Sequence, residues 1–443
     1  MTDIFSIGLS GIRAYQQALS TVSSNIGNAE NPNYVRRDLR LSELSTTSAI
    51  NPYFIHQINF AGVDIDGVAR SSDPFLEANV RLTGASLYGA ETRARWMENT
   101  ETALADTEHG VGARLAKLFA MGEELAGSPF SNILRNQFIN DIDAAVSAIN
   151  RTANDLANVS DQLISSAEQE VAAFNAALDN LATTNLALRV AADGTPKQAA
   201  LLDQRDTALA VLSERMDVTT SFGDKGIANI TYDGQSLVDI GEVNSLSVLA
   251  GADDSIGLVA NAVNLTAPSR GSLAAMISSA ATTIERRTEL DDLAVQFAAD
   301  LNGWQAAGET DGGGAGPPFL SAAGGAAALT MLTQDPSDLA LAAPGGPANG
   351  NIANLPTLRG PAGVEQVWTN IIGAQAITTA AAQSENAAAA TQHQAARDAR
   401  DRLSSVDLDR EAADLLRFQE AYNASARVIQ VARETMQSIL AIF

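Results

Sequence analysis

Hydrophobic residues recur every seven positions at both ends of the chain. The first stripe consists of residues spaced seven apart and of residues between them at offsets of three or four: Phe5, Leu9, Ile12, Tyr15, Leu19, Val22 and Ile26. A stripe with this period is the seam of a heptad helix. The pattern predicts a helix over residues 4–28, which ends before Pro32 because proline lacks an N–H and disfavours helix in the residue before it.

The last segment repeats this design. Its stripe has six apolar residues, each seven positions after the one before: Leu408, Leu415, Tyr422, Ile429, Met436 and Phe443. Asp407 is the expected N-cap, and Asp409 and Glu411 complement the helix dipole in the first turn. The predicted helix runs to Phe443, and its apolar last turns would fray in water unless something covers them.

Two heptad helices at opposite ends of a chain are expected to pair with each other as a coiled coil. This pairing would bring the termini together and would make everything between them an insertion. The alternative, in which each helix packs separately on a globular domain, stays open at this point.

The middle of the chain is predicted to be helical on both sides of a β-rich segment. Long apolar stripes predict helices over residues 74–104, 130–190, 197–215, 271–306 and 364–403. Between them, residues 216–265 carry β-branched runs broken by glycine, and Asp233-Gly234 is the signal of a type I′ hairpin. Residues 311–363 hold seven of the thirteen prolines and eleven glycines, which predicts a loop-rich segment.

The predicted fold class is therefore mainly α with a β-rich insertion. We expect an elongated chain in which a coiled coil of terminal helices carries a helical stalk and a β-containing outer domain. The expected parts are the two halves of the inner coiled-coil domain (1–50 and 404–443), the helical stalk (51–215 and 364–403), the β-rich outer domain (216–270), a helical return (271–310) and a Gly/Pro/Ala-rich loop segment (311–363). A chain of 443 residues is long enough for several such cores.

The composition excludes several classes of function for this chain. With 28 Lys+Arg against 52 Asp+Glu, the net charge is −24, so phosphate backbones and anionic lipid surfaces repel the chain. We expect neither nucleic acid nor membrane as a partner. The absence of cysteine excludes disulfides, thiol catalysis and cysteine-ligated metals.

The acidity is concentrated in the middle of the chain. Residues 1–50 carry four acids and four bases, and residues 397–443 carry eight acids and seven bases. A nearly balanced surface suits close packing against copies of itself, whereas a highly charged one suits solvent. Chance clustering of charge is the alternative.

The sequence offers little for catalysis or metal binding. The histidines, His56, His109 and His393, lie far apart and in no ligand spacing. Residues 234–238 begin like a nucleophile elbow but lack the closing glycine, and the glycines of 312–316 precede no Lys-Ser/Thr pair. We therefore expect no catalytic residue, no metal ligand and no cofactor.

Two acidic motifs are interpreted as structural features and not as metal-binding sites. Residues 64–67 are too short for an EF-hand loop. Asp203 and Asp206 could share a cation, but Arg205 between them favours a solvated or ion-paired helix face.

The N-terminal segment resembles a known signature. Residues 9–12 (LSGI), 24–28 (SNIGN) and 32–37 (PNYVRR) are similar to the N-terminal motif of the bacterial flagellar axial proteins, which form the rod, the hook and the hook-associated parts. The motif residues in this chain are Ser24, Asn25, Ile26, Asn28, Pro32 and Tyr34. The family has Gly where Asn33 stands, and Asn tolerates a positive φ well enough to keep the turn.

Two further segments resemble one branch of that family. Residues 406–416 (VDLDREAADLL) and 418–430 are similar to the hook-associated protein 1 family, although Arg410 stands where that family usually has an acid. Residues 201–206 (LLDQRD) are also similar to it and are not expected in hook or rod proteins. This resemblance assigns the Asp203 and Asp206 pair to a structural helix.

The resemblance implies a structural protein without catalysis. It implies a homo-oligomeric ring at the hook–filament junction, with the hook protein below, hook-associated protein 3 above, and an export chaperone on the C-terminal helix. It also implies export through the flagellum-specific secretion system, which fits an N-terminus that shows Asp3 where a secretory signal would carry a base. Another axial protein of the hook or distal rod, or a secreted helical protein with an enzymatic insertion, remain the alternatives.

The residues expected to form the assembly interface are those of the two heptad stripes. They are Phe5, Leu9, Ile12, Leu19, Val22 and Ile26 on one wall, and Leu408, Leu415, Tyr422, Ile429, Met436 and Phe443 on the other.

Overall fold

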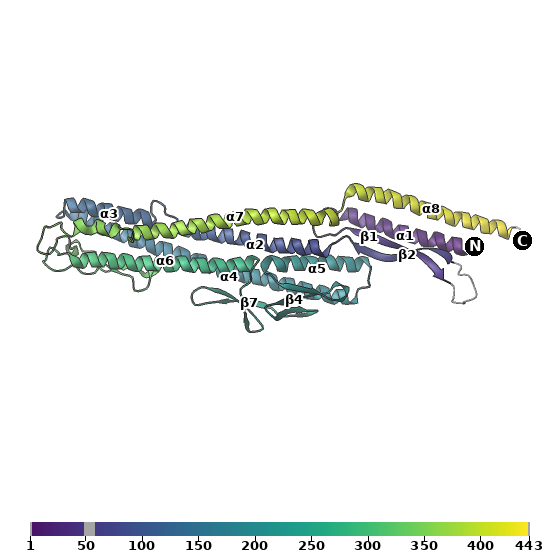
Figure 1. Cartoon of the computed structure of the whole chain (residues 1–443), viewed down its shortest axis with the longest axis horizontal. Coiled ribbons are helices and arrows are strands. Elements are labelled where there is room, and N and C mark those ends of the chain that lie inside the picture. Colours follow the sequence, from purple (N-terminus) through teal and green to yellow (C-terminus); the bar gives the residue numbers. More distant parts are fainter. Residues whose placement is uncertain (1, 48–57, 442–443) are drawn as a thin grey trace. The chain divides into compact units, whose positions relative to one another are not determined.

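The computed structural model describes residues 2–47 and 58–441, and 66% of it is helical (Figure 1). The chain divides into two compact units. The first unit consists of Met1–Ala85, Ala173–Ser245 and Ala390–Phe443, and the second consists of Ser86–Ala172 and Leu246–Ala389. The predicted class, mainly α with a β-containing insertion, is confirmed.

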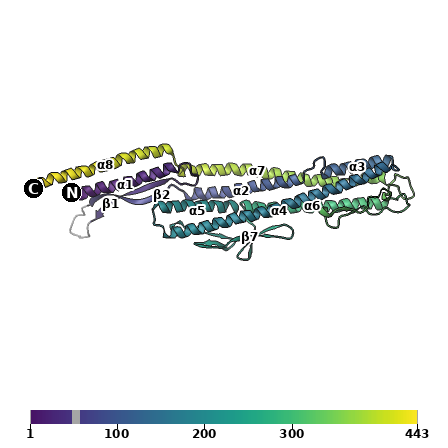
Figure 2. The same ribbon diagram turned by 180° about the vertical axis from the view of Figure 1, so that it is seen from behind.

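The terminal helices belong to the first unit and pack against each other. Helix α1 (Thr2–Gly27) and helix α8 (Leu408–Leu440) lie side by side in both ribbon views (Figure 1, Figure 2). Asp407 is the N-cap of α8, as predicted, because its Oδ1 accepts hydrogen bonds from the N–H groups of Asp409 and Arg410 at 3.0 and 3.3 Å. The prediction that the two ends of the chain pair is confirmed.

Small residues of α1 allow the two helices to approach closely. Gly8, Gly11, Ala14 and Ala18 are buried. A Cβ on Gly8 would lie 2.6 Å from Cγ1 of Ile429, and one on Gly11 would lie 2.7 Å from Oγ of Ser425. These distances are shorter than any van der Waals contact, so the packing depends on the absence of side chains there.

A β-hairpin that the sequence patterns did not predict covers another side of α1. Strand β1 (Arg37–Thr47) pairs antiparallel with β2 (Ile58–Arg70), and two register shifts interrupt the ladder. The alternation of Val63 and Ile65 with aspartates was the available signal. The hairpin is fixed to the helix because Oγ of Ser10 accepts a hydrogen bond from Val63 N–H at 3.2 Å.

In the ranges that the structure describes, six further α-helices form the remaining helical framework. They are α2 (Pro74–Ala103), α3 (Val111–Gly127), α4 (Asn132–Val190), α5 (Pro196–Arg215), α6 (Ser272–Ala307) and α7 (Val364–Ser404). Five of them match predicted ranges, whereas α3 was missed. Its helical pattern is interrupted by Gly112 and Gly122, and the burial of Leu115 and Leu118 in the core of the second unit outweighs this weak propensity.

The β-rich segment contains two separate sheets. The four-stranded sheet comprises β3 (Thr219–Phe222), β4 (Ala228–Tyr232), β5 (Gln235–Asp239) and β6 (Glu242–Val243), and the three-stranded sheet comprises β7 (Leu246–Ala250), β8 (Ile256–Ala260) and β9 (Val263–Leu265). The predicted turn at Asp233 and Gly234 joins β4 to β5 with φ of 48° and 73°, the two positive values that a type I′ turn needs. The first sheet lies in the first unit and the second sheet in the second unit.

The Gly/Pro/Ala-rich segment 311–363 is an ordered part of the second unit. It contains β10 (Leu320–Ser321), β11 (Thr330–Met331) and the 3₁₀ helices η2 (Ala326–Ala328), η3 (Pro336–Asp338) and η4 (Ile352–Arg359). A further 3₁₀ turn, η1 (Asp224–Gly226), lies in the first unit.

Side chains of α6 bind the backbone of this segment. Asn302 Oδ1 accepts hydrogen bonds from the N–H groups of Phe319 and Leu320 at 2.7 and 3.0 Å. Trp304 Nε1 donates to the Asn351 carbonyl at 2.9 Å. These bonds satisfy polar backbone groups that a buried loop would otherwise leave unpaired.

Candidate assembly interface

Asn25 of α1 forms the centre of a polar cluster at the end of the terminal helices. Its Nδ2 donates to the Arg37 carbonyl at 2.9 Å and to Glu411 Oε2 at 3.0 Å. Its Oδ1 accepts from Tyr34 Oη at 2.8 Å and from Arg37 N–H at 3.1 Å. The buried amide therefore uses both donors and both acceptor positions, which fixes the turn after α1 and the first residue of β1 against α8.

A buried ion pair joins the two ends of the chain. Arg36 Nε donates to Glu411 Oε1 at 2.7 Å, and the side chains are only 8% and 1% exposed. Burial works against the charge of Arg36, but the hydrogen bond to Glu411 and the charge of Asp38 outweigh it and raise the pKa of the guanidinium. Because a buried charge without its partner is costly, neither residue can be removed alone without loss of stability.

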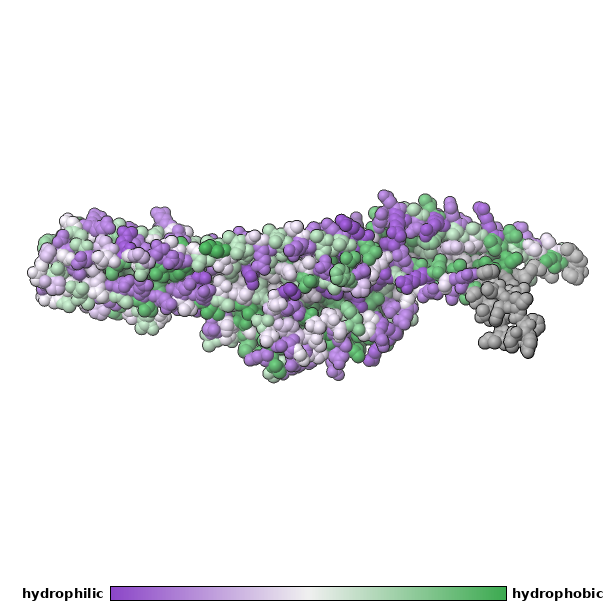
Figure 3. Space-filling view, viewed as in Figure 1, coloured by the Kyte–Doolittle hydropathy of each residue, from purple (hydrophilic) through white to green (hydrophobic). Residues whose placement is uncertain are grey.

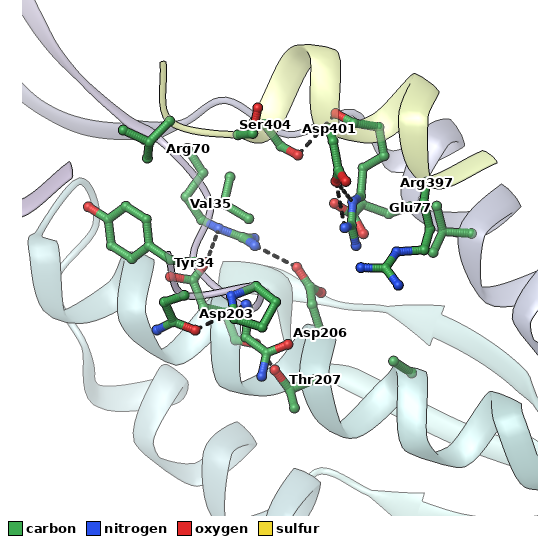
Figure 4. Close-up of a pocket in the computed structure, with 18 of the residues that line it drawn as sticks. Tyr34, Val35, Arg70, Glu77, Asp203, Asp206, Thr207, Arg397, Asp401 and Ser404 are labelled. Atoms are coloured by element: carbon green, nitrogen blue, oxygen red, sulfur yellow. Dashed lines mark hydrogen bonds and ion pairs between the residues drawn. The ribbon is translucent and has the colours of Figure 1, made fainter. Parts of the chain in front are cut away.

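The carboxylates of the 201–206 motif bind arginines from the hairpin. Arg37 Nη2 lies 2.9 Å from Asp203 Oδ2, and Arg70 reaches Asp203 at 2.8 Å and Asp206 at 2.7 Å. Burial raises the pKa of Asp203, and the two arginines offset only part of this effect. The interpretation of this motif as an ion-paired helix face is confirmed, and Figure 4 shows Arg70 between Asp203 and Asp206.

A cavity of about 260 Å³, lined by charged and apolar residues alike, lies beside these pairs, and Figure 4 shows most of its lining. Glu77 and Arg81 both line the cavity. Burial disfavours their charged forms, so it raises the pKa of Glu77 and lowers the pKa of Arg81. Within residues 2–47 and 58–441, no group of three or more potential ligands could hold a metal ion.

The other residues of the N-terminal motif shape the turn after α1. Ser24 Oγ lies 3.3 Å from Tyr34 Oη, and Asn28 Nδ2 donates to the Ser24 carbonyl at 2.8 Å. Ile26 and Pro32 remain exposed. Four of the six motif residues thus hold the turn by side-chain hydrogen bonds, and two face outward.

The predicted heptad residues differ in how far the single chain buries them. Val22 is buried, and five are partly buried: Ile12, Leu19, Leu415, Tyr422 and Ile429. Five others have exposed fractions between 36% and 54%: Phe5, Leu9, Ile26, Leu408 and Met436. Phe443 lies outside the described residues. The large side chains of α1 mostly face outward because the small residues Gly8 and Gly11 occupy the contact with α8.

Sequence patterns missed the small-residue face of α1 and the buried ion pair. The face had a signal, since Gly8, Gly11, Ala14 and Ala18 recur at three- and four-residue spacing. The ion pair had none, because nothing in the sequence relates Arg36 to a glutamate hundreds of residues later.

The described histidines are bound to polar neighbours. His109 Nδ1 lies 2.7 Å from Nη2 of Arg114, and His393 Nδ1 lies 3.2 Å from Thr83 Oγ1. Burial, together with the charges of Arg397 and Arg400, lowers the pKa of His393. His56 lies outside the described residues. None of the helices in the described ranges is both long and apolar enough to cross a bilayer.

Comparison with known proteins first defines the class. Residues 402–442 match the family model of the flagellar basal body rod FlgEFG protein C-terminal region, so α8 is of the kind found in axial proteins of the bacterial flagellum. Residues 97–320, half of the chain, match the flagellar hook-associated protein FlgK helical domain. The chain belongs to the family of flagellar hook-associated protein FlgK, and it is a structural component of the hook–filament junction in the extracellular flagellum.

Individual relatives agree with this assignment. Flagellar hook-associated protein 1 of Bacillus subtilis is 25% identical over 97% of this chain and 96% of its own length. The Salmonella typhimurium protein of the same name is 26% identical over 72% of this chain, and the match spans only 60% of that longer protein. The flagellar hook junction protein FlgK from Burkholderia pseudomallei has a similar fold, with a TM-score of 0.50 at 16% identity over 55% of this chain and 46% of that one.

Proposed function

We propose that the paired terminal helices are the assembly element of this subunit and that copies of the chain form a closed ring between hook and filament. The observation that carries this proposal is the set of apolar side chains that α1 and α8 leave in solvent. In the space-filling view, green apolar surface lies among purple polar surface over these helices (Figure 3). Exposed apolar area of this kind is typical of a surface that another protein covers.

Identical copies arranged head to tail use two different surfaces of each subunit. Such heterologous contacts close into a ring when the rotation between copies divides a full turn. The nearly balanced charge of residues 1–50 and 397–443 supports this arrangement, because it limits repulsion between copies at close range. The acidic remainder of the chain would face solvent.

The ring would have different neighbours on its two sides. The hook protein would lie below it and hook-associated protein 3 above it, so that the subunit adapts one structure to the other mechanically, with no catalysis. Before assembly, an export chaperone would cover α8, whose Leu416 and Val431 are 61% and 60% exposed. Export would follow the flagellum-specific route without a cleaved signal peptide.

A single substitution in the helix pair tests the assembly role. Ile429 lies against Gly8, so Ile429→Asp places a charge in the contact between α1 and α8. We expect cells that carry this variant to build hooks without filaments and to lose flagellin to the medium, as electron microscopy and an assay of the medium would show.

The control is Gln430→Asp, which adds the same charge at an exposed position of the same helix. It should leave the filaments intact. Filaments on the hooks of Ile429→Asp cells would refute the assembly role of the helix pair.

A further inference from the structure

Helix α8 has a second apolar face that the described part of its own chain does not cover. The residues of α8 that touch α1 include Glu411, Phe418, Ser425 and Ile429. About 130° further around the helix, by helical geometry, lies a group of exposed apolar residues. They are Ala413, Leu416, Ala424, Val428 and Val431. We call this group the outer face of α8.

Helix α1 also has an outward apolar stripe. Its members lie on one side of the helix, about 110° from the small residues that pack inside the chain. They are Phe5, Leu9, Ile12, Leu19 and Ile26, all exposed or partly buried. Each chain therefore carries two solvent-exposed apolar surfaces, one on each terminal helix.

We propose that the outer face of α8 binds the outward stripe of α1 from a neighbouring copy of this chain. This inference rests on the proposed ring and names the surfaces that would form it. The two surfaces belong to opposite sides of the same helix pair, so each copy can offer one to each neighbour. That is the arrangement that a head-to-tail ring requires.

The register within the chain indicates how the two surfaces meet. Inside one chain the helices are antiparallel, with Gly8 against Ile429 and Asn25 against Glu411. Copies at the same height in a ring keep equivalent residues level, so the same register applies between copies. It sets Leu9 opposite Val428. It also sets Ile12 opposite Ala424, Leu19 opposite Leu416 and Phe5 opposite Val431.

Charge complementarity supports the same pairing. Arg13 follows Leu9 by one helical turn along the edge of the outward stripe, and Glu420 stands on the outer face between Leu416 and Val428. Both are exposed, and within the part of the chain that the structure describes neither side chain forms an ion pair or a hydrogen bond. In the proposed register the Cα atoms of these two residues are offset along the helix axis by about one helical turn, which the long arginine side chain can bridge.

Cross-linking between different chains tests the pairing directly, because the natural sequence has no cysteine. Two full-length variants, Leu9→Cys and Val428→Cys, are expressed together in cells that lack the native gene, and their isolated hooks and filaments are oxidised. We expect a disulfide-linked dimer that neither variant forms alone, because the linked Cα atoms must lie within about 7 Å.

The matched control replaces Val428→Cys by Gln430→Cys. Gln430 is exposed at nearly the same height but points about 160° away. Several-fold less dimer is expected from this control. Filaments that form normally while Leu9→Cys and Val428→Cys give no more dimer than the control would overturn the inference and leave the proposed ring standing. A photoreactive residue at 428 that links to the hook protein or to a chaperone, and not to a second copy, would overturn it as well.

A charge exchange covers the case in which the cysteine variants do not assemble. Arg13→Glu and Glu420→Arg should each lower the number of filaments per cell several-fold, and the double variant should recover most of this loss. A double variant no better than the single variants would overturn the pairing.

Discussion

At the scale of residues, Asn25, Arg36 and Glu411 hold the two ends of the chain in one arrangement. Asn25 uses all of its hydrogen-bonding capacity, and Arg36 and Glu411 bury opposite charges against each other. Such a cluster favours one geometry, because any shift leaves a buried polar group without its partner. It therefore contributes specificity to the pairing of α1 with α8.

Removing the carboxylate from the buried pair should be costly. In Glu411→Leu, Arg36 remains buried without its main partner, and the expected loss is about 3–5 kcal/mol of the stability of the helix pair. Hydrogen exchange should show faster exchange of α8 amides. Because the double variant Arg36→Met, Glu411→Leu leaves no buried charge at this pair, it should recover most of the protection. Unchanged exchange in Glu411→Leu would mean that the pair does not hold the helices.

Acidification should weaken the contact between α7 and α2 at His393. The pKa of His393 in the folded chain lies below the value of about 6.5 for a free histidine. Between these two pKa values, the unfolded chain binds more protons than the folded chain. The contribution of neutral His393 to the free energy of unfolding is therefore complete above about pH 6.5 and is lost as the pH falls toward the folded pKa.

His393→Gln should remove this part of the pH dependence. Urea unfolding followed by circular dichroism at neutral and mildly acidic pH measures the difference between the two proteins. Equal acid sensitivity in both would contradict the assignment to His393.

At the scale of elements, α1 and α8 show how one helix can serve two contacts. The small residues of α1 face α8, its polar side chains Ser10 and Asn25 meet the hairpin, and its large apolar residues face outward. The heptad stripe that predicts this helix therefore lies mostly away from the contact within the chain. Apolar periodicity reveals that a face is meant to be covered, but it does not say by which partner.

Close packing at Gly11 should not tolerate a side chain. Gly11→Val would place its Cβ 2.7 Å from Ser425 Oγ, so α1 and α8 must separate. Overpacking of this kind costs about 1–3 kcal/mol, and amide exchange in both helices should accelerate. Gly27→Val is the matched control because a Cβ there meets nothing within 4 Å, and it should leave exchange in α8 unchanged. Similar exchange in the two variants would disprove the close contact.

At the scale of the whole molecule, the chain separates assembly from core formation. The terminal helices, the hairpin and α5 lie in the first unit, whereas the largest apolar core, with Trp304 and Trp368, lies in the second. The first unit carries the exposed apolar helix faces, and the second carries most of the net acidity. This division suits a subunit that is held by one part while another part faces solvent.

Deleting α8 should leave the second unit folded. All three tryptophans, Trp96, Trp304 and Trp368, lie in that unit, so their fluorescence reports on it alone. A chain that ends at residue 406 should unfold with the same fluorescence midpoint as the full chain, yet build no filaments. A lowered midpoint would show that the terminal helices stabilise the second unit.

Elements that depend on local pattern could be predicted from the amino-acid sequence. Heptad spacing gave both terminal helices, Asp407 and Pro74 marked helix starts, and Asp233-Gly234 marked a hairpin turn, because each of these signals acts through neighbouring residues. The resemblance of residues 24–37 and 406–430 supplied the family.

Contacts between distant segments became evident in the folded chain. Three contacts join segments that are remote in sequence. They are the ion pair of Arg36 with Glu411, the ion pairs of Arg37 and Arg70 with Asp203, and the packing of Gly8 against Ile429. No local pattern encodes such contacts, because burial and approach distance arise only when the whole chain has folded. For the same reason, a stripe predicted as a seam within the chain can instead be left exposed for a second copy.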